Sequence, residues 1–174
     1  MQDILTKAKQ IKLVIFDVDG VLTDGSLYFG DDGQEYKAFN ARDGHGMKML
    51  MASGVEIGII TGRTSDVVKH RMQNLNVSHV YQGQLEKLPA FEALLKKLSL
   101  TEDQVAYVGD DVVDLPIMVR TGLAITVPNA HELAIKHAHW ITTQQAGHGA
   151  ARDVCELIMK AQGNYEPAML KYLA

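Results

Sequence analysis

Short runs of apolar and β-branched residues recur along the chain and alternate with longer amphipathic stretches. The strand-like runs lie at residues 11–16, 55–60, 79–81, 105–108, 123–127 and 140–142. Between them, apolar positions recur with helical spacing at about residues 44–53, 65–75, 87–98, 112–121, 130–137 and 150–162. Regular alternation of strands and helices predicts an α/β fold, in which a mostly parallel sheet is flanked by helices on both faces.

One segment interrupts this alternation. Residues 26–29 and 34–39 have strand-like patterns and flank the turn Gly30-Asp-Asp-Gly33. A Gly/Asp turn between two such patterns predicts a small β-hairpin, which would form a flap at about residues 24–39. The flap would follow the first strand and project from the edge at which open α/β sheets bind ligands.

The bulk features describe one domain with one core. The chain has 174 residues, which is an ordinary domain size, so residues 1–174 are interpreted as a single unit. Cys155 is the only cysteine, which excludes an intramolecular disulfide, and it lies on the apolar face of a predicted helix. Residues 164–174 lack a clear periodic pattern and are a candidate mobile tail.

Charge and hydropathy argue against two classes of partner. The net charge is -4 and no dense block of Lys and Arg occurs, so nucleic acid is not expected as a main partner. The apolar runs are far shorter than a membrane span, and residues 1–10 lack the apolar core of a signal peptide. We therefore expect a cytoplasmic protein with no membrane partner.

Four polar clusters each follow a predicted strand. In chain order they are residues 17–23, residues 61–63, Lys87, and residues 109–111 with Asp114. Because parallel strands bring their carboxyl ends to one edge of a sheet, these clusters are expected to meet there. The same edge would then carry several carboxylates, a lysine and a threonine hydroxyl.

The carboxylates predict a magnesium-dependent site for phosphoryl transfer. Asp17, Asp19 and Asp110 would repel one another unless a cation lies among them. Oxygen ligands of this kind suit Mg²⁺, which also bridges to phosphate. Asp17 can then attack phosphorus and form an aspartyl-phosphate. Asp19, two residues further on, can protonate the leaving oxygen and later deprotonate the attacking water.

Three further groups complete the predicted chemistry. The hydroxyl of Thr61 and the N–H of Gly62 can donate hydrogen bonds to phosphate oxygens. Lys87 would screen the charge of the phosphate, so that an anionic carboxylate can approach it. Phosphoryl transfer requires mainly positioning and charge neutralisation. The sequence therefore favours a phosphatase with Asp17, Asp19, Thr61 and Lys87 as catalytic residues.

In this order, the four clusters resemble the four motifs of the haloacid dehalogenase superfamily of phosphohydrolases. The first, Asp17-Val-Asp-Gly-Val-Leu-Thr23, is a fairly specific signal by itself. The complete ordered set, with each motif after a strand, is very specific. The resemblance implies a Rossmann-like fold and a magnesium ion held by Asp17, by the backbone carbonyl of Asp19 and by Asp110.

A finer resemblance covers nearly the whole chain. The hairpin in place of a large cap, and residues 40–44, 83–88 and 147–152, are similar to the 3-deoxy-D-manno-octulosonate 8-phosphate phosphatase family. This capless branch of the superfamily serves lipopolysaccharide precursor synthesis. The substrate contacts that the resemblance implies are Asp19, Asn40, Ala41, Arg42, Asp43, Gly44, Lys48, Gly62, Arg63, Arg71 and Lys87. It also implies a homotetramer, in which Arg152 is our candidate for a residue that reaches a neighbouring subunit's site.

Other interpretations stay open from the residues alone. Asp17 and Asp19 could cap backbone groups of a loop, and Arg63 and Arg71 could form a solvated helix face. The substrate could be a nine-carbon acid phosphate, such as N-acylneuraminate 9-phosphate or its deaminated analogue. A signalling module that stores an aspartyl-phosphate also has acidic residues, Thr and Lys after parallel strands, although it does not need a general acid at Asp19.

Overall fold

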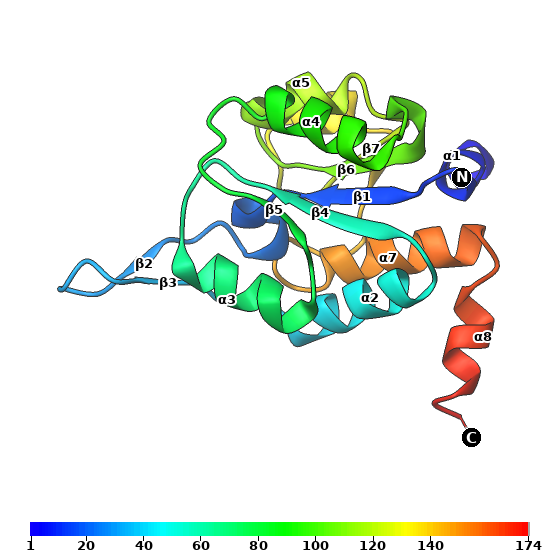
Figure 1. Cartoon of the computed structure of the whole chain (residues 1–174), viewed down its shortest axis with the longest axis horizontal. Helices are drawn as coiled ribbons and strands as arrows, with labels where there is room; N and C mark the ends of the chain where they lie inside the picture. Colours follow the sequence, from blue (N-terminus) through cyan, green and yellow to red (C-terminus); the bar gives the residue numbers. More distant parts are fainter. Residues whose placement is uncertain (174) are drawn as a thin grey trace.

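The computed structural model describes residues 1–173 and contains a six-stranded parallel sheet (Figure 1). In chain order the strands are β1 (Leu13–Phe16), β4 (Glu56–Ile60), β5 (His79–Tyr81), β6 (Val105–Val108), β7 (Leu123–Thr126) and β8 (Trp140–Ile141). Their order across the sheet is β5-β4-β1-β6-β7-β8. The chain adds β4 and β5 on one side of β1 and then β6, β7 and β8 on the other, so the strand order reverses between β1 and β6. Open sheets of this kind bind ligands at such a point.

Helices cover both faces of the sheet, which confirms the predicted fold class. One layer contains α1 (Gln2–Lys9), α2 (Ala41–Ala52), α3 (Asp66–Leu75) and α7 (Ala150–Ala161). The other contains α4 (Leu88–Leu98), α5 (Leu115–Met118) and α6 (Glu132–His137). Along β1, Val14 and Phe16 pack against the first layer, whereas Leu13 and Ile15 pack against the second. Burial on both faces explains why such strands are continuous apolar runs.

Helix α1 and the region of residues 112–121 differ from the sequence prediction. Helix α1 was not among the predicted helices, and it buries Ile4 and Ala8 against the first layer. The single helix expected at 112–121 is divided into a 3-10 turn at Val112–Asp114 and α5. Pro116 lies in the first turn of α5, where its missing N–H is tolerated and a new helix can begin.

The carboxyl-terminal segment is helical in the part that the structure describes. Helix α8 (Tyr165–Leu170) leaves the end of α7 and packs Tyr165 and Met169 against the core (Figure 1). Residue 174 of the predicted tail lies outside the described residues. Cys155 is fully buried on α7, as its position in the sequence predicted. Within residues 1–173, none of the helices has the length and apolar composition that a bilayer crossing requires.

The predicted hairpin is present and projects from the body of the molecule (Figure 1). It consists of β2 (Tyr28–Phe29) and β3 (Glu35–Tyr36), which pair antiparallel. The turn is closed by a hydrogen bond of 2.8 Å from the Gly30 N–H to the Gln34 carbonyl. Its aromatic side chains lie largely in solvent, with Phe29 60% exposed. This short flap follows β1 and the turn of residues 18–22 in the chain.

Candidate active site

The carboxyl ends of β1, β4 and β6 border one pocket. It has a volume of about 270 Å³ and is lined by Asp17, Asp19, Thr61, Gly62, Arg63, Gln84, Leu85, Lys87, Asp110, Asp111 and Val113. The structure therefore brings together every residue that the sequence assigned to catalysis or to magnesium. Thr61 is buried, and its N–H donates to the Tyr81 carbonyl at 3.0 Å, so the backbone of β4 and β5 positions it.

Asp17 is held by the strand that it follows and by two donors. Its N–H donates to the Val108 carbonyl at 3.0 Å, which extends the contact between β1 and β6 by one residue. Its Oδ1 accepts a hydrogen bond of 2.7 Å from the Val18 N–H. Its Oδ2 lies 2.7 Å from Nζ of Lys87. Because the side chain is also buried, these contacts leave it one orientation.

The loop after Asp17 requires a glycine. Residues Val18–Leu22 form a wide turn in which Gly20 has a φ of 88°. A Cβ at this position would lie 2.1 Å from Oδ2 of Asp110. The left-handed backbone and the missing side chain together allow the loop to pass against the carboxylate of Asp110. This contact explains the glycine in the first motif.

Lys87 is a buried cation between two carboxylates. Its Nζ lies 2.7 Å from Oδ2 of Asp17 and 2.7 Å from Oδ1 of Asp114. Burial alone would lower the pKa of Lys87, but the charges and hydrogen bonds of the two aspartates raise it overall. The side chain therefore remains protonated, and it aligns the nucleophile candidate Asp17 from one side.

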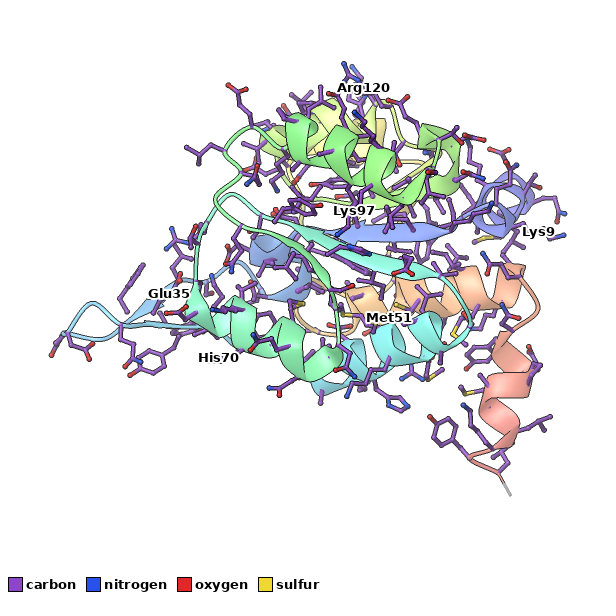
Figure 2. The ribbon with its side chains drawn as sticks, viewed as in Figure 1. Lys9, Glu35, Met51, His70, Lys97 and Arg120 are labelled. Carbon is purple, nitrogen blue, oxygen red and sulfur yellow. The ribbon has the colours of Figure 1, made fainter. Side chains whose placement is uncertain are left out.

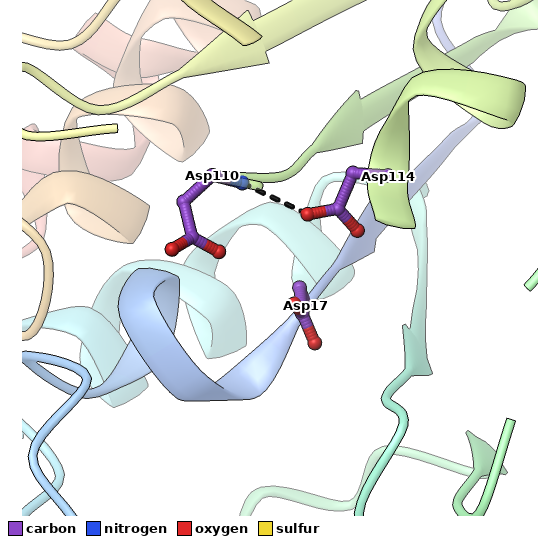
Figure 3. A group of neighbouring side chains, drawn as sticks. All are labelled: Asp17, Asp110 and Asp114. Atoms are coloured by element: carbon purple, nitrogen blue, oxygen red, sulfur yellow. Dashed lines mark hydrogen bonds between the residues drawn. The ribbon is translucent and has the colours of Figure 1, made fainter. Parts of the chain in front are cut away.

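Asp114 is occupied entirely by protein donors. Its Oδ1 accepts from Lys87 and, at 2.6 Å, from the hydroxyl of Tyr107. Its Oδ2 accepts from the N–H groups of Asp110 at 3.0 Å and Asp111 at 3.1 Å, the first of which is drawn in Figure 3. Asp114 is fully buried. It therefore orients Lys87 and the loop that carries Asp110.

Three carboxylates converge beside Lys87, as Figure 3 shows. One oxygen each from Asp17, Asp110 and Asp114 lies within 4.8 Å of the others. Burial and the charge of Asp114 raise the pKa of Asp17 to about 6, although Lys87 opposes this shift. Burial, followed by the charges of Asp17 and Asp114, raises the pKa of Asp110 to about 7. One ammonium does not neutralise three carboxylates, so the cluster favours an additional cation.

The free oxygens of this cluster fit Mg²⁺. Within residues 1–173, Oδ1 of Asp110 is a buried oxygen with no hydrogen-bond partner. A buried acceptor of this kind is costly unless a ligand satisfies it. Each oxygen of Asp114 accepts from two protein donors, whereas each oxygen of Asp17 has one donor and Oδ1 of Asp110 has none. Asp17 and Asp110 are therefore the carboxylates that could hold the ion. A hard divalent cation prefers such all-oxygen ligands.

Asp19 faces the same pocket and is tied to the hairpin. Its carboxylate contacts Nζ of Lys37, which lies just after β3. Nζ of Lys37 is also 3.2 Å from Oε1 of Glu35. The same Glu35 oxygen accepts from Nη2 of Arg63 at 2.9 Å. The hairpin thus contacts both the first and the second motif.

The remaining predicted substrate contacts lie apart from this pocket in the single chain. They are Asn40, Ala41, Arg42, Asp43, Gly44, Lys48, Arg71 and Arg152. None of this set, as far as the described residues extend, lines the pocket beside Asp17. Their contact with substrate stays a prediction.

Several of these residues instead connect the amino-terminal ends of α2 and α7. Asn40 caps α2 by accepting from the N–H of Arg42 at 2.8 Å, and its carbonyl accepts from Arg71 at 3.2 Å. The buried Asp43 accepts from the Arg152 N–H at 2.8 Å. Burial raises the pKa of Asp43 despite this hydrogen bond. The Arg152 side chain is 2.5 Å from Glu156, within its own helix.

Two contributions to the site were not predicted from the sequence. Asp114 lies in the fourth cluster but was assigned no role, and Tyr107, which lies inside β6, was not a candidate. The hairpin was predicted only as a flap, without a role for Lys37 or Glu35. The spacing of Asp110 and Asp114 over one helical turn was a usable signal. A lysine on a hairpin gives no such signal, because most are solvated.

Comparisons with known proteins agree with these motifs. The sequence profile of the family described as haloacid dehalogenase-like hydrolase matches residues 76–153. The chain is 48% identical over 166 residues to the 3-deoxy-D-manno-octulosonate 8-phosphate phosphatase KdsC of Escherichia coli. The aligned region covers 95% of this chain and 88% of that protein.

The chain is also similar to proteins whose structures have been solved. One is the 3-deoxy-D-manno-octulosonate 8-phosphate phosphatase of Moraxella catarrhalis, whose structure contains a magnesium ion, a phosphate ion and a KDO molecule. It superposes on this chain with a TM-score of 0.97 and is 44% identical, and the match covers 99% of both chains. A probable YrbI family phosphatase of Pseudomonas syringae pv. phaseolica has a TM-score of 0.99 and 52% identity, with 100% of this chain and 99% of that chain covered.

Proposed function

This chain belongs to the 3-deoxy-D-manno-octulosonate 8-phosphate phosphatase family of the haloacid dehalogenase superfamily, and we propose that it hydrolyses the 8-phosphate of that eight-carbon sugar acid. The observation that carries the chemistry is the buried Lys87 between Asp17 and Asp114, beside the unpartnered oxygen of Asp110. The similarity to 3-deoxy-D-manno-octulosonate 8-phosphate phosphatases supports the eight-carbon substrate. The products are the free sugar acid, KDO, and inorganic phosphate.

In the first step, Asp17 acts as the nucleophile. A bond forms between a carboxylate oxygen of Asp17 and phosphorus, while the bond from phosphorus to the sugar oxygen breaks. Asp19 transfers its proton to that departing oxygen. The Thr61 hydroxyl and the Gly62 N–H, both at the pocket wall, donate to the phosphate oxygens. Lys87 keeps Asp17 aligned and reduces the repulsion between the two anions.

In the second step, water attacks the aspartyl-phosphate. Asp19, now a carboxylate, accepts the proton of that water. The bond between phosphorus and the Asp17 oxygen breaks, which releases phosphate and regenerates the Asp17 carboxylate. Because Asp19 lies in a pocket that remains open to solvent, water can enter beside it after the sugar acid leaves.

The residues proposed to hold Mg²⁺ are Asp17, Asp110 and the backbone carbonyl of Asp19. The two carboxylates stand within ligand distance of a common ion, and the oxygen of Asp110 needs a partner. When bound, the ion neutralises charge on the phosphate and on the carboxylates. Removal of metal with a chelator is expected to abolish activity, and addition of Mg²⁺ is expected to restore it.

The proposed assembly is a homotetramer in the cytoplasm that serves lipopolysaccharide precursor synthesis. Its support is the exposed aromatic surface of the hairpin, formed by Tyr28, Phe29 and Tyr36, and the absence of a cap domain within the described chain. A neighbouring subunit would cover that surface and bring further substrate contacts to the pocket. Arg42, Arg71 and Arg152 lie on the body of the chain and are the proposed groups for the sugar-acid part.

The test is release of phosphate from 3-deoxy-D-manno-octulosonate 8-phosphate with Mg²⁺, compared with N-acylneuraminate 9-phosphate and its deaminated analogue. The proposal predicts the highest kcat/KM for the eight-carbon substrate, over many turnovers. Preference for a nine-carbon acid would keep the mechanism and overturn the substrate. A single turnover that leaves a stable phosphoprotein would instead indicate a signalling module.

A further inference from the structure

The hairpin carries one buried cation to the edge of the pocket. The side chain of Lys37 is 1% exposed, although most of the hairpin around it is exposed. Its ammonium contacts Oδ1 of Asp19 and lies 3.2 Å from Oε1 of Glu35. A buried ammonium is stable only when acceptors and opposite charges surround it. Lys37 is therefore fixed between two carboxylates.

Asp19 depends on this lysine for the orientation of its side chain. Within residues 1–173, the Asp19 carboxylate accepts one hydrogen bond, and Lys37 donates it. The nearby hydroxyl of Thr23 instead accepts from the Gly25 N–H at 3.2 Å, and it donates to the Val18 carbonyl at 3.4 Å. The loop is thus held by its own backbone contacts, whereas the carboxylate of Asp19 is held from outside.

The position of Lys37 is itself fixed from its far side. Oε1 of Glu35 accepts from Nε of Arg63 at 3.2 Å and from Nη2 of Arg63 at 2.9 Å. Figure 2 labels Glu35 on the hairpin strand nearest α3. Burial would raise the pKa of Glu35, but hydrogen bonds from Lys37 and Arg63 lower it overall. Glu35 is therefore an anion between two cations, and it anchors Lys37 to the second motif.

We propose that Lys37 is a positioning residue that holds the carboxyl group of Asp19, so that its second oxygen carries the proton that is transferred to the leaving oxygen. With Oδ1 bound to Lys37, the second oxygen of Asp19 is the one available for that proton. Loss of Lys37 frees the side chain to adopt other rotamers and lowers the fraction of productive complexes. The inference rests on the proposed phosphatase function, and it gives the hairpin a role in chemistry within its own chain.

The test is a double-mutant cycle between Lys37→Met and Asp19→Asn, measured as kcat/KM with the eight-carbon phosphate and Mg²⁺. Because general acid catalysis contributes about 10²–10⁴-fold, Lys37→Met alone is expected to lower kcat/KM by about 10–100-fold. In the Asp19→Asn background the same substitution should have an effect of less than about 2-fold, since residues that act as a unit are not additive. An equal loss in both backgrounds would overturn the proposal.

The leaving group supplies a second readout. An alkyl phosphate such as the sugar-acid ester needs a proton on its leaving oxygen, whereas p-nitrophenyl phosphate releases a weakly basic phenolate. Lys37→Met should therefore reduce kcat/KM for the alkyl ester much more than for the aryl ester, as Asp19→Asn should. A merely structural lysine would reduce both alike, and this comparison stays valid if the variant is only partly folded.

Matched variants separate the remaining explanations. Lys37→Arg keeps a cation and should recover most of the activity lost in Lys37→Met. Lys69→Met removes a lysine from the exposed surface of α3 and should leave kcat/KM unchanged. If wild type hydrolyses no phosphate ester, the proposed function fails. If wild type is active and Lys37→Met equals it, the function stands and the role of Lys37 is wrong.

Discussion

The carboxylate cluster of Asp17, Asp110 and Asp114 and the hairpin β2–β3 both contact residues that line the pocket, but their side chains have opposite environments. Asp114 is 0% exposed and Lys87 is 2% exposed, and their polar atoms bond to the body of the chain. On the hairpin, Phe29 is 60% exposed and Tyr36 is 53% exposed. The cluster is thus complete within one chain, whereas the hairpin presents apolar surface outward.

The residues that act on the phosphate and those proposed to bind the sugar acid therefore lie in different parts of the molecule. The groups that act on phosphate sit at strand ends, where the sheet determines their positions. The residues proposed to bind the sugar acid, Arg42, Arg71 and Arg152, lie on α2, α3 and α7 and do not line that pocket. Lys37 is the point at which the two regions meet, because the hairpin delivers its ammonium to Asp19.

The largest expected effect concerns the nucleophile. Asp17→Asn keeps the shape of the side chain but removes the attacking carboxylate, so kcat should fall by about 10⁴-fold or more. Steady-state phosphate release measures this loss, and circular dichroism checks the fold. Asp103→Asn, at an exposed position outside the pocket, is the control and should retain full activity. Activity in Asp17→Asn close to wild type would refute the assigned nucleophile.

A smaller effect is expected from Asp114, which supports the cluster without touching substrate. Asp114→Asn removes one charge beside the buried Lys87 and weakens the contact with Tyr107. Breaking a buried ion pair costs about 3–5 kcal/mol, so urea unfolding should show a free energy of unfolding lower by about that amount. The kcat should also fall by about 100-fold, because Asp17 and Asp110 lose their alignment. An unchanged free energy of unfolding would show that the cluster does not stabilise the fold.

The pH dependence of the free energy of unfolding tests whether Asp110 has a raised pKa beside Asp17 and Asp114. The pKa of Asp110 is raised from 3.8 to about 7, so the folded chain binds this proton more tightly than the unfolded chain. The contribution of Asp110 to the free energy of unfolding is fully present below pH 3.8 and is lost as pH rises through about 7. In EDTA, the free energy of unfolding should therefore fall over this window. Asp110→Asn should reduce that fall by about 1–3 kcal/mol.

Magnesium is the control for this measurement. Added Mg²⁺ should stabilise wild type most at neutral pH, where the carboxylates are charged, and should stabilise Asp110→Asn much less. The opposite trend, in which metal-free wild type gains stability as pH rises from 4 to 7 while Asp110→Asn does not, would contradict the raised pKa of Asp110.

The smallest effect on catalytic chemistry is expected from the hairpin aromatics. Phe29→Ser should leave the secondary structure unchanged, since an exposed side chain contributes less than about 0.5 kcal/mol to the fold of one chain. If the hairpins form the proposed tetramer interface, sedimentation should show smaller species. Val119→Ser, also at an exposed apolar position, is the matched control. A wild-type monomer in solution would refute the assembly.

The fold and the centre of the site follow from local sequence signals. Asp17 and Thr61 come directly after buried apolar strands, and Asp110 follows the end of β6 after one glycine, Gly109. A parallel sheet gathers such positions at one edge. Helices α1 and α8 were missed because their short sequences have no strong capping signal, and packing against α7 stabilises them.

The missed parts of the site depend on tertiary packing. The hydroxyl of Tyr107 reaches Asp114 only because β6 and the following turn fold over Lys87. Lys37 is buried only because the hairpin lies against the loop of Asp19. Neither residue has a periodic position or a motif of its own, so sequence pattern alone does not distinguish them from solvated or core residues.

The most direct test of the central claim is detection of phosphate on Asp17 during turnover. The protein would be mixed with 3-deoxy-D-manno-octulosonate 8-phosphate and Mg²⁺, quenched in acid within milliseconds, digested and analysed by mass spectrometry. The account predicts a phosphorylated peptide containing Asp17 that forms and disappears at rates compatible with kcat, and that is absent in Asp17→Asn. Rapid hydrolysis with no phosphorylated peptide at any quench time, or with phosphate on another residue, would contradict it.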